Sequence, residues 1–233
     1  MREFPDLHGF YKKNFSQTYR DEKIARHVHL LDDFYNYWSG AFVHAIEHDL
    51  RGDVNLDNNV MVSFLSTQTM VFDWIGFSLK CGLYDLVRRE LCTILESLML
   101  VSVIENDGRQ LTLTDKLGRW GHLEDDKQID AECIFQMTGL ATWDKYYNLY
   151  RRLRRATSPS VGIAGRRVAH IALGCGQSLD FPYSRPEFLD CFNAWMDIAH
   201  AATQLVALMY ADLRVKHLSF DPLLFKRLRP NTV

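Results

Sequence analysis

Residues 84–105, YDLVRRELCTILESLMLVSVIE, constrain the fold most, because their apolar side chains follow more than one face of a single long helix. One apolar stripe, spaced by three and four residues, consists of Leu83, Val87, Leu91, Ile94, Leu98 and Val101. A second consists of Leu86, Leu95, Leu100 and Ile104. A helix with two apolar stripes needs packing partners on two sides. The sequence therefore predicts a helix at the centre of a bundle.

Glu96 is the charged residue where this helix becomes almost wholly apolar. A carboxylate in such a setting must reach solvent, meet a cation or keep its proton. The first prediction is a half-exposed residue on a narrow polar seam. The alternative is a buried carboxylate with a structural or catalytic role.

Two helical segments are expected before the central helix. Residues 16–49 form either one helix or two that join near Asp32. Residues 57–80 form the next helix, with Asp57 as its N-cap. Gly82 then supplies the left-handed residue that lets the chain reverse into the central helix.

The segments after the central helix are shorter. Residues 111–115, LTLTD, favour a short extended piece, and a single helical turn follows it. Two helices are expected at 126–137 and 143–156. Residues 157–183 are rich in Gly, Pro and Ser and predict a loop, which could hide a short strand at 168–173.

Ser184, followed by Pro186 and Glu187, is the clearest helix start in the chain. The helix it begins is expected to run to about Lys216. Its apolar positions are Phe188, Phe192, Trp195, Ala199, Ala202, Val206 and Met209. The prediction is an all-α, single-domain bundle of about six helices over residues 1–233. It has a glycine-rich loop before the last long helix and peripheral tails at 1–14 and 218–233.

Composition narrows the function. The formal net charge of -2 over 233 residues argues against attraction of the whole surface to nucleic acid or anionic lipid, so a polyanion site must be a local patch. The five cysteines are odd in number and form no CxxC pair, which favours reduced thiols. The N-terminus has no apolar signal-peptide core, and no run of about 20 apolar residues is evident. We expect a cytoplasmic protein with no membrane association.

An arginine cluster is the strongest candidate for a binding site. It comprises Arg151, Arg152, Arg154, Arg155, Arg166 and Arg167. One interpretation is that these arginines pair with the acidic region at residues 105–132, within the fold or across a dimer. The other is a nucleic-acid site, because guanidinium groups suit phosphate oxygens and the neighbouring tyrosines can stack on bases.

His44, Glu47 and His48 form an HxxEH pattern, in which two histidines one turn apart can bind zinc and the glutamate can activate water. His27, His29 or Asp33 would be extra ligands. The alternative is an ordinary amphipathic helix with solvated histidines. If the pattern is a metal site, we expect a divalent metal as cofactor. If it is an ordinary amphipathic helix, we expect no cofactor.

The central helix and the segment YRRLRRATSPS at residues 150–160 resemble a broad group of HEPN-like helical proteins of bacteria and archaea, some linked to abortive infection. The matches to its Y-x-x-L-S-x-x-x-H-P-S element are Tyr150, Leu153, Pro159 and Ser160. Glu96 matches the glutamate of its helical element. The departures are Arg154 in place of the serine, Ser158 in place of the histidine, and Cys92 in place of the arginine one turn before Glu96.

Ribonucleases of that group carry an arginine and a histidine separated by four to six residues. Two pairs have such spacing, Arg20 with His27 and Arg2 with His8, but both lie outside the resembling region. The resemblance therefore implies a helical fold more strongly than ribonuclease activity.

The leading hypothesis is a cytoplasmic helical interaction module that forms a homo-oligomer or binds a partner protein. The resemblance implies a role in prokaryotic defence or regulation, and the arginine cluster predicts binding of RNA or DNA. The alternatives are a metal-dependent hydrolase at the HxxEH pattern and a divergent HEPN-type ribonuclease. Glu47 and Glu96 are the candidate catalytic residues.

Overall fold

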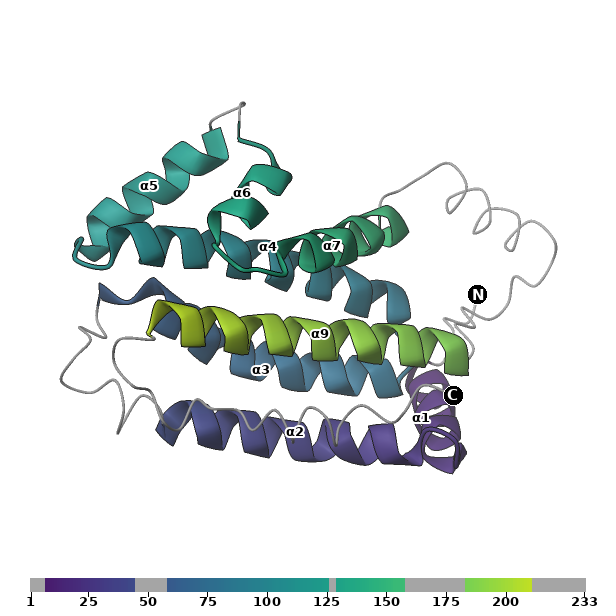
Figure 1. The fold of residues 1–233 in the computed structure, drawn as a ribbon. Coiled ribbons are helices and arrows are strands. Elements are labelled where there is room, and N and C mark those ends of the chain that lie inside the picture. Colours follow the sequence, from purple (N-terminus) through teal and green to yellow (C-terminus); the bar gives the residue numbers. More distant parts are fainter. Residues whose placement is uncertain (1–6, 45–57, 126–128, 158–182, 211–233) are drawn as a thin grey trace, which may run out of the picture.

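The computed structural model describes residues 7–44, 58–125, 129–157 and 183–210. Within these ranges the chain forms eight α-helices and no strand, so the prediction of an all-α fold is confirmed (Figure 1). The number of helices exceeds the six that were expected, because residues 16–49 and 111–115 fold differently from the prediction.

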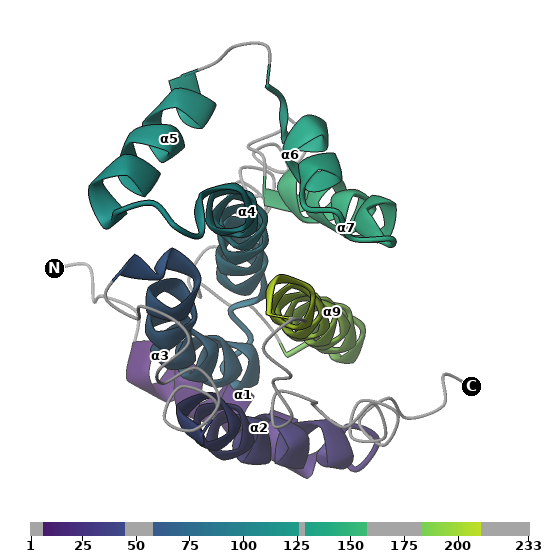
Figure 2. The ribbon, with the colours of Figure 1, turned by 60° about the vertical axis from the view of Figure 1, so that its left-hand side comes forward.

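Helix α4, Tyr84–Gly108, lies at the centre of the bundle, as predicted. It packs against α3 (Val60–Lys80), α7 (Trp143–Thr157) and α9 (Arg185–Met209), and Figure 2 shows these helices on different sides of it. Both apolar stripes are buried except at Leu83 and Leu86, which are partly exposed. The packing explains why one helix needs two apolar faces.

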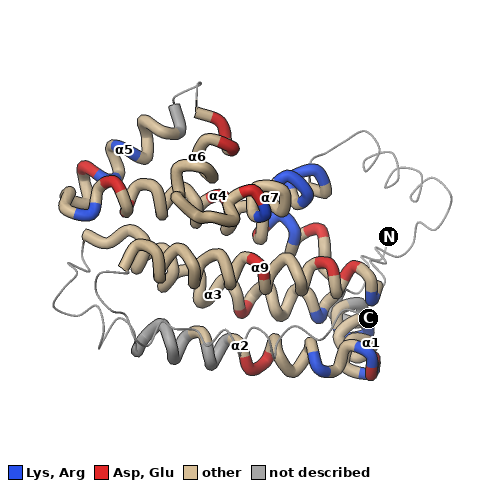
Figure 3. The backbone as a smooth tube through the Cα atoms, in the orientation of Figure 1, with Lys and Arg blue, Asp and Glu red and all other residues tan. Residues whose placement is uncertain are grey.

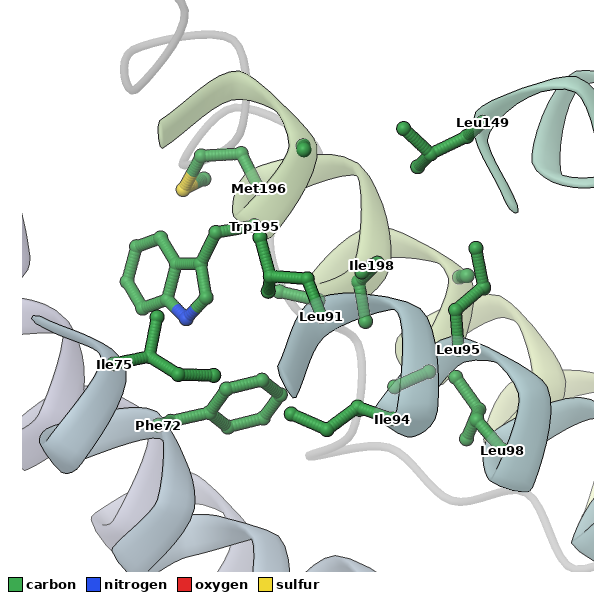
Figure 4. Packing of buried hydrophobic residues seen from close by; sticks show 14 of the residues in the cluster. Phe72, Ile75, Leu91, Ile94, Leu95, Leu98, Leu149, Trp195, Met196 and Ile198 are labelled. Atoms are coloured by element: carbon green, nitrogen blue, oxygen red, sulfur yellow. The ribbon is translucent and has the colours of Figure 1, made fainter. Parts of the chain in front are cut away.

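An aromatic cluster joins α9 and α3 to α2 (Ala25–His44). The ring of Phe34 lies 4.2 Å from that of Trp195 and 5.5 Å from that of Trp38, measured between centroids. Figure 4 shows Trp195 of α9 turned toward Phe72 and Ile75 of α3. Such large rings contribute much of the apolar area that this half of the bundle buries.

The first predicted segment is two helices, α1 (Leu7–Arg20) and α2, and the joint near Asp32 is wrong. The break falls at residues 21–24, where Asp21 Oδ1 accepts a hydrogen bond from the Lys23 backbone N–H. Helix α1 also begins inside the expected tail. Its Asn14 side chain is 1% exposed and donates to the Cys81 carbonyl oxygen, so this part of the tail belongs to the core.

The turn from α3 into α4 is the one predicted. Gly82 has a φ of 78°, which favours glycine, and the Leu83 N–H donates to the Ser78 carbonyl oxygen. At its other end α3 is capped by Asn59, whose side chain accepts from the Val62 N–H at 2.8 Å. The predicted cap, Asp57, lies outside the described residues.

The extended piece predicted at 111–115 is wrong, because α5 begins there and spans Leu113–Asp125. The Thr112 hydroxyl caps this helix by accepting from the Asp115 N–H, and it also donates to the Asp115 carboxylate. Helix α6, Ala131–Met137, starts after Asp130, whose side chain accepts from the Cys133 N–H.

Helices α7 and α9 follow the prediction closely at their starts. Every apolar position predicted to face the core in α9 is buried. Ser184 occupies the N-cap position, although its backbone N–H donates to the Tyr84 hydroxyl and its side chain forms no capping bond. Helix α9 ends at Met209; the predicted extension to Lys216, the tail at 218–233 and the glycine-rich loop fall outside the described residues.

Helix α3 is the one described helix that is long and apolar enough to cross a membrane by length and composition alone. The core helix of a soluble protein satisfies the same two criteria, so this is weak support for a membrane span. Helix α3 packs against α1, α2, α4 and α9. Its outer side nevertheless leaves three large side chains exposed: Met70 (70%), Trp74 (49%) and Phe77 (46%).

Candidate nucleic-acid interface

Helix α7 has one buried face and one face of aromatic and arginine side chains. Tyr146, Leu149, Tyr150 and Leu153 are buried. The other face, at spacings of three and four residues, carries Trp143, Tyr147, Arg151, Arg154 and Arg155. We call these five residues the α7 arginine face; its three arginines are exposed and its two aromatic residues are partly exposed. Figure 3 shows the basic residues concentrated at the C-terminal end of α7.

Two arginines of this face lie against tyrosine rings. The Arg151 guanidinium carbon is 5.7 Å from the centre of the Tyr147 ring, and that of Arg154 is 5.7 Å from the centre of the Tyr150 ring. Arg154 Nη1 also donates to the Tyr150 hydroxyl at 2.6 Å. These contacts position the guanidinium groups but do not neutralise them, so both remain available to an anion.

Arg152 points elsewhere and has an acidic partner. Its Nη1 atom lies 3.1 Å from Asp190 Oδ1 of α9. The Asp190 carboxylate also pairs with Arg88 of α4, which in turn contacts Glu187 at 2.9 Å. Because two carboxylates of α9 face this pair of arginines, Arg152 adds little positive charge to the α7 arginine face.

Pairing of the arginine cluster with the acidic region is not what the described residues show. Within them, none of the α7 arginines forms an ion pair with residues 105–132, and Arg155 forms no ion pair at all. The most buried acid of that region, Glu105, forms an ion pair with Lys116, whose Nζ atom lies 2.9 Å from Glu105 Oε1. Within one chain, Arg152 pairs instead with Asp190 of α9, and pairing of these arginines across a dimer stays a prediction.

A polar seam between α4 and α7 supports Arg154. The Tyr150 hydroxyl donates to Glu96 Oε1 at 2.9 Å, while accepting from Arg154. Glu96 is exposed, in agreement with the predicted polar seam. Burial, and then the nearby Glu96 carboxylate, raise the pKa of Tyr150 to about 12, so its hydroxyl remains a donor at neutral pH.

Cys92 borders the same seam from α4 and is 8% exposed. Burial, and then the Glu96 carboxylate, raise the pKa of its thiol to about 11. A thiol with so high a pKa is almost wholly protonated at neutral pH, where the thiolate would be the nucleophile. Cys92 is therefore a residue of the core.

Acidic residues border the other end of the α7 arginine face. Burial raises the pKa of Tyr147, and the carboxylates of Glu132 and Asp130 add to this rise. Negative charge beside Tyr147 disfavours a phosphate there. An anion is therefore expected over Arg151, Arg154 and Arg155, with the aromatic residues at its edge.

The HxxEH pattern lies almost wholly outside the described residues. His44 ends α2, its side chain is not described, and Glu47 and His48 follow it. The extra metal ligands considered above are wrong within one chain. At a rise of about 1.5 Å per residue, Asp33 lies roughly 16 Å along α2 from His44, and His27 and His29 lie farther.

Within the described ranges no group of three His, Cys, Asp or Glu side chains could hold a metal ion.

Arg166 and Arg167 of the arginine cluster lie outside those ranges. The structure therefore places Arg151, Arg154 and Arg155 together and assigns Arg152 to the α9 carboxylates.

The sequence interpretation missed the buried pair of Lys116 and Glu105, whose side chains are 1% and 2% exposed. Lys116 Nζ also donates to the Asn58 carbonyl oxygen at 2.6 Å, and Glu105 Oε2 accepts from the Val60 N–H at 3.0 Å. Thr112, four residues before Lys116, is a helix-capping residue that would have indicated a helix but not the buried acid that Lys116 contacts.

Comparisons with protein-family models, with curated proteins and with solved structures found no match for this chain. The resemblance to the HEPN-like group stays a prediction. Two of the matching residues, Glu96 and Tyr150, are hydrogen-bonded to each other, and two of the three departures, Cys92 and Arg154, lie at the same seam.

Proposed function

We propose that this protein is a helical interaction module that binds the phosphate backbone of RNA or DNA through the α7 arginine face. The observation that supports this is the exposure of Arg151, Arg154 and Arg155 on one side of α7, with no carboxylate paired to any of them in the described residues. A guanidinium group offers several N–H donors in a plane, which suits phosphate oxygens.

Two tyrosines orient the arginine side chains of this face. Tyr150 fixes Arg154 through a hydrogen bond, and the Tyr147 ring supports Arg151. Both contacts restrict the arginine side chains before an anion binds. Less conformational entropy is then lost on binding, which favours affinity. Trp143 and Tyr147 are partly exposed and offer ring faces on which a base could stack.

The proposed setting comes from the resemblance. It implies a role in prokaryotic defence or regulation. The location that we propose is the cytoplasm, from the cysteine pattern, with the protein acting as a homo-oligomer or with a partner protein. The proposal assigns no reaction to the α7 arginine face, since burial keeps Cys92 and Tyr150 protonated at neutral pH. Nucleic acid is bound there and positioned.

Salt dependence tests the proposal. Each phosphate of duplex DNA that is neutralised contributes about 0.9 to the slope of log affinity against log salt, so three arginines predict roughly -2.7, or about -2.1 for single strands. Fluorescence anisotropy with labelled RNA and DNA, from low to physiological salt, measures this slope.

A matched pair of variants on the same helix sharpens the experiment. Arg155→Ala should weaken binding and make the slope shallower by about 0.9, because it removes an exposed cation without an acidic partner. Arg152→Ala should leave the slope unchanged, because Asp190 already balances that arginine. Equal effects of the two substitutions, or salt-independent binding, would contradict the proposal.

A further inference from the structure

The outer sides of α1 and α3 form an exposed aromatic surface on another part of the molecule. We call it the α1–α3 aromatic face, and its members are Phe15, Tyr19, Met70, Trp74 and Phe77. Four are among the large apolar side chains that the fold leaves exposed, with Tyr19 at 43% beside the three residues of α3. Phe15 is partly exposed.

The four aromatic side chains are in contact with one another and form one surface. The Trp74 and Phe77 rings are stacked with centroids 5.8 Å apart, and the Phe15 ring lies 6.3 Å from Phe77 and 4.8 Å from Tyr19. Met70, Trp74 and Phe77 recur at spacings of four and three along α3, which places them on one side of that helix. A contiguous exposed apolar surface of this kind usually marks an interaction site.

Helix α1 carries basic residues on and near this face. Helix α1 contains Lys12, Lys13 and Arg20, all exposed, and no Asp or Glu. Lys12 lies three residues before Phe15 and seven before Tyr19, so it shares their side of the helix. Figure 3 shows Lys and Arg along α1.

The acidic residues near the face are fewer or already paired. Asp32 pairs with Lys80, and it also accepts a hydrogen bond from the Tyr19 hydroxyl. Glu22 and Asp73 are exposed, at the end of α1 and on α3. Lys12 on this side of α1, together with the exposed Lys13 and Arg20 on other sides of the same helix, outnumbers the exposed carboxylates of Glu22 and Asp73.

We propose that the α1–α3 aromatic face docks the protein on the surface of an anionic lipid bilayer. Tryptophan, tyrosine and phenylalanine insert favourably at the depth of the lipid headgroups, and flanking lysines and arginines reach the headgroup phosphates. Each basic residue near such a surface adds about 1 kcal/mol to the attraction. Helix α3 would lie along the bilayer, because its inner side is packed against α2, α4 and α9.

The charge pattern favours lipid over a second copy of the chain. On self-association, the cations of α1 would need acidic partners on the same face of the other copy. The exposed residues along the outer side of α3 are Ser63, Ser66, Thr67, Met70, Asp73, Trp74 and Phe77. Asp73 is the single carboxylate among them, against three cations, whereas an anionic bilayer supplies negative charge at every headgroup.

Co-sedimentation with vesicles tests the proposal. The full chain should bind vesicles of equal parts phosphatidylcholine and phosphatidylserine, and bind pure phosphatidylcholine much more weakly. Lys12→Ala with Lys13→Ala should lower affinity for the anionic vesicles by about thirtyfold, which corresponds to 1 kcal/mol for each lysine. Trp74→Ser with Phe77→Ser should abolish binding, because it removes the inserting rings while the cations remain.

Two controls separate this surface from others. Leu117→Ser on α5 removes an equally exposed apolar residue, at 54%, and should leave vesicle binding unchanged. Arg155→Ala removes a cation of the α7 arginine face and should also leave it unchanged, so failure of one proposal is distinguishable from failure of the other. Far-ultraviolet circular dichroism checks that each variant is folded.

Three outcomes would overturn the proposal. The first is that the wild-type protein ignores anionic vesicles. The second is that it binds them as well after Trp74→Ser with Phe77→Ser. The third is a concentration-dependent dimer in sedimentation equilibrium that these two substitutions abolish, without any vesicle binding, which would assign the face to self-association.

Discussion

The Tyr150 hydroxyl donates a hydrogen bond to the Glu96 carboxylate over 2.9 Å and so connects the middle of α7 to the middle of α4. The two residues are 54 positions apart in the sequence. Because the same hydroxyl accepts from Arg154, the contact between two helices also sets the direction of an exposed cation. Packing of the central helix and presentation of the α7 arginine face thus depend on one phenol group.

Tyr150→Phe should therefore lower the free energy of unfolding by about 1 kcal/mol, because a hydrogen bond to a charged but exposed acceptor contributes modestly. Urea denaturation at neutral pH measures this. Glu96→Gln keeps an acceptor for the hydroxyl and should cost less. A Tyr150→Phe protein as stable as the wild type would show that solvent replaces the bond at no cost.

The central part of the fold could be predicted because its signals are local. The apolar stripes of residues 84–105 determine that α4 is buried on several sides, and Gly82 determines where the chain reverses. The prediction from secondary-structure propensity was wrong at residues 111–115, where alternating Leu and Thr favour a strand. There the Thr112 cap and the burial of Lys116 against Glu105 stabilise a helix.

The candidate site was predictable in position but not in its electrostatics. The sequence locates the arginines, and helical spacing puts Arg151 and Arg155 on one side. Which arginine is neutralised depends on where α9 lies, because the partner of Arg152 is Asp190, 38 residues later. A contact of this kind follows from how helices pack, which no local pattern determines.

The buried pair of Lys116 and Glu105 gives a second prediction. Lys116→Met should destabilise the protein by about 3–5 kcal/mol, because it leaves a carboxylate buried without its cation. Thermal or urea unfolding measures the loss. Adding Glu105→Gln should restore much of it, since glutamine removes the charge and its amide oxygen can still accept from the Val60 N–H. A double variant as unstable as Lys116→Met would contradict this account.

Asp21 joins the turn between α1 and α2 to the start of α9. Its Oδ2 atom accepts from Arg185 Nε at 2.7 Å and from the Tyr183 hydroxyl at 2.6 Å. The hydrogen bond from Arg185 is the largest influence on the pKa of Asp21 and lowers it, with the Tyr183 bond acting in the same direction. The ionised carboxylate is thus favoured in the folded protein.

The pH dependence of Asp21 follows from that direction. A carboxylate whose pKa is lowered by folding stabilises the protein above its unfolded pKa of about 3.9, and this contribution is lost as pH falls through the folded value. Asp21→Asn should cost about 1–2 kcal/mol at neutral pH and progressively less below about pH 4. Urea midpoints for both proteins between neutral and acid pH test this. A difference that stays constant across that range would disprove the role of ionisation.

The last prediction concerns alkaline stability and the thiol of Cys191, which is fully buried in α9 and lies 3.8 Å from the Tyr84 carbonyl oxygen. Burial raises the pKa of Cys191 to about 12, whereas an unfolded thiol titrates near 8.5. As pH rises, the thiol of the unfolded chain ionises before that of the folded protein, which favours the unfolded state. The contribution of Cys191 to stability is therefore complete below about pH 8.5 and is lost as pH rises toward the folded pKa.

One such thiol lowers the free energy of unfolding by up to about 1.4 kcal/mol for each pH unit in this window. Cys191→Ala should therefore give a shallower decline between about pH 9 and 10. Tyrosines of the unfolded chain, with pKa values near 10, begin to titrate there too, but they contribute equally in all the proteins compared. Val206→Ala, another buried truncation on α9, should be destabilised equally at every pH in the window, because it creates a cavity without removing a titrating group. Guanidinium denaturation across this range compares the three proteins, and the decline of wild type and Val206→Ala should be parallel. A decline in Cys191→Ala as steep as theirs would show that this thiol ionises freely in the folded state.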